Sequence, residues 1–118
     1  MNVNLLTIKL PITAIVSVLH RITGVIIFLS LPVTLWLLQQ SLISELSFIA
    51  LKQLLLSDVG KSISWLVLTA FFFHVVAGCR HLLMDLGLGE SKCVGIVGAR
   101  LTIVTTGIIS SIIGVWIW

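Results

Sequence analysis

Three stretches of the chain contain no Asp, Glu, Lys or Arg, and they limit the folds it can adopt more than any other feature. The stretches are residues 22–44, 62–79 and 101–118. A helix needs about 20 predominantly apolar residues to cross the hydrocarbon core of a bilayer. Charged residues make up only 9% of the chain, whereas soluble domains contain about 25%. The sequence therefore predicts an all-α membrane protein with three transmembrane helices.

The expected spans cover residues 14–38, 62–86 and 99–118, and together they form one transmembrane domain over residues 1–118. The first apolar run is longer than the roughly 7–15 residues of a signal-peptide core, so it is expected to remain in the membrane as a span. The net charge of +3 is small. Basic residues in loops and at helix ends are typical of a topology signal, not of a nucleic-acid surface.

The segments around the spans carry capping and loop signals. Pro11 is expected to open the first helix, because a proline in the first turn gives up no hydrogen bond, and Pro32 should bend it. Residues 41–56 fit a short helix along the membrane interface. Asp58 or Ser62 is expected to cap the second span. The glycines Gly87, Gly89 and Gly95 predict a flexible loop before the third span. That span should begin near position 98.

Basic residues are distributed unequally between the two sides of this topology. Only Lys52 and Lys61 fall on one side. Five fall on the side of the N-terminus: Lys9, Arg21, Arg80, Lys92 and Arg100. Because Lys and Arg are enriched in cytoplasmic loops, the N-terminus is expected in the cytoplasm and the C-terminus on the opposite side.

Two stripes of polar residues and glycines interrupt the first two spans. The first stripe has the spacing i, i+3, i+4, i+7 and consists of Ser17, His20, Arg21 and Gly24. The second has the spacing i, i+4, i+7, i+11 and consists of His74, Gly78, His81 and Asp85. Each spacing places its members on one face of a helix. His74 is expected about 10 Å deeper than His81, from seven residues at about 1.5 Å each, so one metal ion cannot bind both.

Polar groups inside a membrane are costly, and such groups indicate a functional site. A haem needs an axial imidazole, room for the porphyrin, and basic groups for its propionates. His74 offers the imidazole, Gly78 leaves room, and Arg80 lies nearer the aqueous side with the cations of the first stripe. A quinone needs hydrogen-bond donors and a cation, and Ser17 and Arg21 provide them one turn apart.

Both stripes lie in segments that resemble the signature motifs of the cytochrome b membrane subunit of succinate dehydrogenase, or complex II. Residues 17–24 read Ser-Val-Leu-His-Arg-Ile-Thr-Gly, which resembles the motif S-x-x-H-R-x-[ST]-G. Residues 74–85 read His-Val-Val-Ala-Gly-Cys-Arg-His-Leu-Leu-Met-Asp, which resembles H-x-x-x-G-x-R-H-x-x-x-D. Residues 11–15, Pro-Ile-Thr-Ala-Ile, are also similar to bacterial members of the family. The resemblance extends over nearly the whole chain.

The resemblance implies a role for each motif residue. His74 would be an axial ligand of the iron of haem b, and His20 and Arg21 would lie near the haem propionates. Ser17 and Arg21 would line the ubiquinone site. The second axial histidine would come from a small hydrophobic anchor subunit, so the three spans would form part of a heteromeric helix bundle.

The function implied by the resemblance is membrane anchoring and electron transfer. Electrons from succinate would pass through a flavoprotein subunit and an iron–sulfur subunit to ubiquinone, which links the tricarboxylic acid cycle to the respiratory chain. The membrane would be the bacterial inner membrane, with the C-terminus in the periplasm. The chain has no nucleotide-binding fingerprint and no iron–sulfur cysteine pattern, so no dehydrogenase activity is expected from it alone.

Each of these residues also has a purely structural interpretation. His74 can hydrogen-bond to a neighbouring helix, Arg21 can extend to the membrane surface, and Ser17 can bond to its own helix. His81 and Asp85, one turn apart, can form a solvated pair.

Alternatives also exist for the haem ligands and for the function. His20 and His81 are predicted at similar depth and could ligate a haem within this chain. The chain could instead anchor a quinol:fumarate reductase, or serve as a structural anchor that has lost its haem. A small transporter subunit without haem could use His74 and Arg21 as a proton or substrate path.

Overall fold

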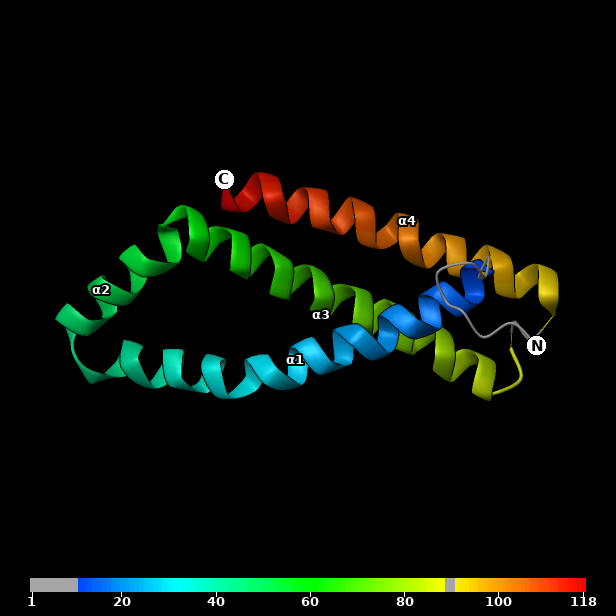
Figure 1. Ribbon diagram of the computed structural model, residues 1–118, viewed down its shortest axis with the longest axis horizontal. Coiled ribbons are helices and arrows are strands. Elements are labelled where there is room, and N and C mark those ends of the chain that lie inside the picture. Colours follow the sequence, from blue (N-terminus) through cyan, green and yellow to red (C-terminus); the bar gives the residue numbers. More distant parts are fainter. Residues whose placement is uncertain (1–10, 89–90) are drawn as a thin grey trace, which may run out of the picture.

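Three long helices lie side by side along the molecule, and a short helix closes one end between the first two (Figure 1). The computed structural model describes residues 11–88 and 91–118, and the predicted roles of Lys9 and Gly89 fall outside them. Four helices occupy the described part of the chain: α1 (Ile12–Ile43), α2 (Glu45–Leu56), α3 (Asp58–Asp85) and α4 (Lys92–Ile117). By length and composition α1, α3 and α4 can each cross a membrane. The predicted all-α membrane protein with three spans is confirmed.

Serine side chains define the starts of three helices. Ser44 accepts a hydrogen bond from the Ser47 amide at 3.0 Å, and Ser91 accepts one from Val94 at 3.2 Å. Ser57 caps α3 by accepting from the Gly60 amide at 3.1 Å. A cap residue needs an extended backbone and an oxygen within reach of an amide two or three residues later. The prediction that Asp58 or Ser62 caps this helix was therefore wrong.

Helix α1 runs from Ile12 to Ile43, so it extends beyond the predicted end at residue 38 and stays helical across Pro32. Pro11 lies just before the helix in an extended conformation. Helix α2 falls within the segment 41–56, for which the sequence predicted a short helix. The Ser47 hydroxyl donates to the Gln40 carbonyl at 2.7 Å and fastens α2 to the end of α1.

Helix α4 begins at Lys92, well before the predicted start at residue 99. The glycines in this segment serve close packing, not loop flexibility. The carbonyl of Gly95 accepts a hydrogen bond from Arg80 of α3 at 3.1 Å. A Cβ atom on Gly98 would lie 3.3 Å from Arg80 Nε. Gly87, with φ of 85°, is the one described residue in the left-handed region, and it lies just after the end of α3, where the sequence predicted a loop.

The packed interior between the helices is thin and built mainly from small side chains, with Phe73 as its one large buried side chain in the described residues. One stripe of α4 is buried, and its members are Gly95, Ala99, Thr102, Thr106 and Ser110. Small residues let helix backbones approach closely, which is how helices associate in lipid. Most large apolar side chains instead face outward, including Phe28 at 71% exposure. An outer surface of this kind suits lipid or partner helices, as expected for a membrane subunit.

Candidate functional site

The two polar stripes meet where α1 packs against α3. The imidazole of His20 stacks on that of His74, with ring centroids 4.2 Å apart and planes 7° from parallel. His20 also lies 6.2 Å from His81, at an interplanar angle of 19°. Sequence spacing placed each stripe on one face of its own helix. Only the packing of α1 on α3 puts His20 between two histidines of the facing helix.

The hydrogen bonds of His74 determine which of its ring nitrogens carries the hydrogen. Its Nδ1 lies 3.1 Å from the backbone carbonyl oxygen of His20. A carbonyl oxygen only accepts, so Nδ1 is the donor, and in the neutral ring Nε2 keeps its lone pair. The Thr23 hydroxyl donates to the same carbonyl at 3.0 Å. A metal-binding histidine usually has this arrangement, with the far nitrogen bonded to a carbonyl or carboxylate. In this orientation Nε2 is the ring nitrogen of His74 that a metal could bind.

Each stripe contains a glycine that makes room for a histidine of the facing helix. A Cβ atom on Gly24 would lie only 3.0 Å from Cε1 of His74. A Cβ atom on Gly78 would lie 3.3 Å from Nε2 of His20. Gly78 was expected to leave room for a porphyrin, whereas in the structure the His20 ring lies next to it. The sequence feature that could have predicted this contact is the presence of one glycine and one histidine in each stripe. When the helices pack, the histidine of one stripe can fit against the glycine of the other.

Beside the histidines lies a cavity of about 150 Å³. Its polar lining comes from two guanidinium groups, two imidazoles and a hydroxyl: Arg21, Arg80, His20, His81 and Ser17. None of its described lining residues is acidic. The predicted site residues Ser17, His20 and Arg21 are therefore brought together, and Arg80 joins them from α3. His74 stands next to this group without lining the cavity. The cavity suits a ligand with carboxylate or carbonyl oxygens.

His81 and Asp85 form an exposed pair at the end of α3. The atoms His81 Nε2 and Asp85 Oδ2 are 3.8 Å apart, and the side chains are 63% and 64% exposed. Exposed pairs of this type contribute about 0–1 kcal/mol. The geometry matches the solvated pair that sequence spacing allowed.

The alternative in which His20 and His81 sandwich a haem iron is disfavoured by their arrangement. Two axial ligands point their nitrogens at the iron from opposite sides of the porphyrin. His20 and His81 instead present their ring faces to one another. His74 remains the better candidate ligand.

The chain is similar to known membrane subunits over nearly its whole length. The family described as "Succinate dehydrogenase/Fumarate reductase transmembrane subunit" matches residues 1–115. The succinate dehydrogenase cytochrome b556 subunit of Coxiella burnetii is 41% identical over 118 residues, covering 99% of this chain and 94% of the relative. The subunit of the same name from Rickettsia felis is 36% identical over 93 residues, covering 76% and 70%. This multi-pass membrane protein therefore belongs to the family of succinate dehydrogenase and fumarate reductase transmembrane subunits.

Proposed function

We propose that this succinate dehydrogenase membrane anchor holds haem b and ubiquinone and takes part in electron transfer from succinate to ubiquinone. The observation that carries the proposal is the hydrogen bonding of the His74 ring. Its Nδ1 is bonded to a backbone carbonyl, so Nε2 is free to bind a metal, and it stands beside a cavity lined by cations. The relatives' name, cytochrome b556, supports haem b as the group concerned.

The residues present fit a haem. His74 would bind the iron through Nε2, and His20 and Arg21 would hold the propionates. A second ligand to the haem would come from a small hydrophobic anchor subunit. When bound, the haem supplies one-electron transfer. The protein itself sets the tautomer and the orientation of the His74 ring through the His20 carbonyl. Gly24 lets α1 pack closely against His74 of α3.

Ubiquinone would bind beside Ser17 and Arg21, which line the cavity and are exposed. The hydroxyl of Ser17 and the guanidinium of Arg21 donate hydrogen bonds to the carbonyl oxygens of the quinone. The fixed charge of Arg21 also stabilises negative charge that develops on those oxygens during reduction. The electrons would come from an iron–sulfur subunit, which receives them from a flavoprotein subunit.

The proposed location is the bacterial inner membrane, with the N-terminus in the cytoplasm and the C-terminus in the periplasm. The distribution of basic residues supports this orientation, since only Lys52 and Lys61 fall on the proposed periplasmic side. The cavity with Ser17 and Arg21 then faces the cytoplasm, where soluble subunits can dock.

The test is an absorption spectrum of the purified complex, reduced minus oxidised, for wild type and for His74→Ala. We expect a haem b signal in the wild type and its loss or marked alteration in the variant. His81→Ala is the comparison variant, because it removes from the same helix the histidine of the alternative haem pair. A colourless wild-type complex, or an unchanged spectrum in His74→Ala with loss in His81→Ala, would refute the assignment. Assays with succinate and with fumarate then establish the direction, since the family includes both kinds of enzyme.

A further inference from the structure

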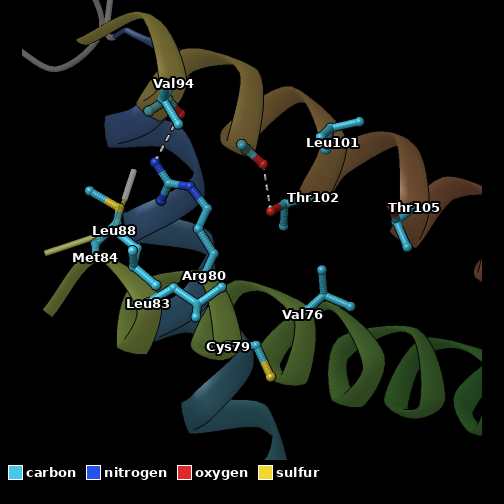
Figure 2. A pocket seen from close by; sticks show the side chains of 12 residues that line it. Val76, Cys79, Arg80, Leu83, Met84, Leu88, Val94, Leu101, Thr102 and Thr105 are labelled. Carbon is cyan, nitrogen blue, oxygen red and sulfur yellow. Dashed lines mark hydrogen bonds between the residues drawn. The ribbon is translucent and has the colours of Figure 1, made fainter. Parts of the chain in front are cut away.

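A groove of about 430 Å³ lies between α3 and α4, and the proposed function does not use it (Figure 2). Most of the side chains that line it are apolar, among them Val76, Leu83 and Leu101. Along α4 it reaches from Val94 to Thr105, which is about 16 Å for eleven residues at about 1.5 Å each. A groove of this length and lining suits an extended hydrocarbon chain.

The groove lies on the side of α3 that points away from the candidate haem ligand. Leu83 follows His74 by nine residues, or about two and a half helical turns, so the two side chains lie on opposite faces of α3. A partner helix that shares a haem with His74 would therefore approach another side of α3. The groove is left open to the bilayer, and Leu101 in its wall is 59% exposed.

A positive charge stands at the end of the groove that is nearest the start of α4. The side chain of Arg80 crosses from α3, and its Nη2 donates to the Gly95 carbonyl at 3.1 Å (Figure 2). Its Nε lies beside Gly98, where a Cβ atom would be only 3.3 Å away. Both glycines line the groove, and neither lines the smaller cavity beside α1. The guanidinium is therefore held at the wall of the groove.

The groove provides no counter-charge for this guanidinium. None of the described residues that line it is acidic. Arg80 Nε is sealed from solvent without a hydrogen-bond partner, and the Gly95 carbonyl accepts one N–H group but carries no net charge. Arginine cannot lose its proton, and a partly buried cation in a membrane is expensive unless an anion compensates it. The groove therefore favours an apolar ligand that has an anionic group at one end.

We propose that the groove binds an anionic phospholipid, with an acyl chain between Leu83 and Leu101 and the phosphate against Arg80. The planar guanidinium matches a phosphate through parallel N–H donors. Arg80 lies five residues before the end of α3, or about 7.5 Å from it, so its side chain can meet a headgroup at the membrane surface. A zwitterionic headgroup would also bring an ammonium group, for which the described lining has no carboxylate. The site is independent of the proposed haem and quinone.

The experiment is native mass spectrometry of the purified complex in detergent, titrated with phosphatidylglycerol. Arg80→Gln removes the charge, and the affinity for phosphatidylglycerol should fall about fivefold, the loss expected from one basic side chain near an anionic headgroup. Arg100→Gln is the matched control, because it removes an exposed charge of α4 that does not line the groove. It should bind phosphatidylglycerol as the wild type does. Phosphatidylcholine with the same acyl chains should bind the wild type more weakly.

A second pair of variants fills the groove and leaves the charge in place. Leu101→Trp adds a large side chain to the lining, so it should displace the acyl chain and weaken phosphatidylglycerol binding. Ile108→Trp is its control, because Ile108 lies on the same helix at 57% exposure and does not line the groove. This pair keeps the test decisive if Arg80→Gln does not assemble.

Four results would overturn the inference. Equal affinities in Arg80→Gln and Arg100→Gln would exclude a contact between Arg80 and the phosphate. Equal affinities in Leu101→Trp and Ile108→Trp would exclude the groove as the binding site. Displacement of phosphatidylglycerol by added ubiquinone would show that the quinone tail occupies the groove. A changed haem spectrum in Arg80→Gln, with unchanged phosphatidylglycerol binding, would assign the guanidinium to the haem instead.

Discussion

Replacement of Gly24 by alanine tests the packing that joins the two polar stripes. The new Cβ atom would lie 3.0 Å from Cε1 and 3.5 Å from Nδ1 of His74. The imidazole has little freedom to retreat. It stacks on the His20 ring at a centroid distance of 4.2 Å, and its Nδ1 is bonded to the His20 carbonyl. Relief of the overlap therefore moves α1, or breaks one of these two interactions.

The size of the effect follows from two opposing terms. Alanine in a helix interior is favoured over glycine by about 0.5–1 kcal/mol. Overpacking of a filled site costs about 1–3 kcal/mol. The net expectation for Gly24→Ala is a loss of about 0–2.5 kcal/mol, centred on about 1 kcal/mol. Gly107 provides the matched control, because it lies in α4 and its Cβ atom would have no neighbour within 4 Å. Gly107→Ala should gain about 0.5–1 kcal/mol.

The assay compares melting temperatures of the purified complexes at one scan rate, together with their reduced-minus-oxidised spectra. Gly24→Ala should melt below the wild type and Gly107→Ala at or above it. If His74 is the haem ligand, Gly24→Ala should also shift or weaken the haem signal, since the ring that binds the iron has moved. Equal melting temperatures and identical spectra for the two variants would refute the interlocking of Gly24 with His74.

Two further predictions concern the cavity and the contact between α3 and α4. Ser17→Ala removes a hydrogen-bond donor to the quinone and should raise the quinone KM about tenfold, with an unchanged haem spectrum. Ser111→Ala, away from the cavity, is the control. Equal quinone KM values in the two variants would contradict the assignment of Ser17. Trp65→Phe loses the bond from Nε1 to the Ser110 carbonyl (2.9 Å) and should cost about 1 kcal/mol. The melting temperature of this variant is compared with that of Trp116→Phe, because the Trp116 side chain is 81% exposed. A fall in melting temperature no larger than in Trp116→Phe would show that the hydrogen bond contributes nothing.

The membrane class and the contents of each polar stripe were predictable, because both depend on local properties. Whether a segment can cross a bilayer depends on its own length and charge. Whether Ser17, His20 and Arg21 share a face depends only on the helical repeat. The structure agrees with both predictions. The one large error in helix limits was the start of α4, where Gly95 was interpreted as a loop residue and the helix was expected to begin near residue 98.

That error has a tertiary cause. Glycine is unfavourable in an isolated helix. At Gly98 the side chain of Arg80 on α3 occupies the space next to the position that a Cβ atom would take. No pattern within residues 92–98 contains that information, since the partner lies on another helix.

The amino-acid sequence by itself determined that the chain crosses a membrane as helices and which polar groups it carries into the bilayer. Tertiary structure alone decided that His20 stacks on His74, that its carbonyl leaves Nε2 of His74 free, and that Arg80 shares a cavity with Arg21. The physical reason is the distance along the sequence over which each effect acts. Hydrophobic length and helical periodicity act within one segment, whereas the His20 carbonyl and His74 are 54 residues apart and meet only through the packing of α1 on α3.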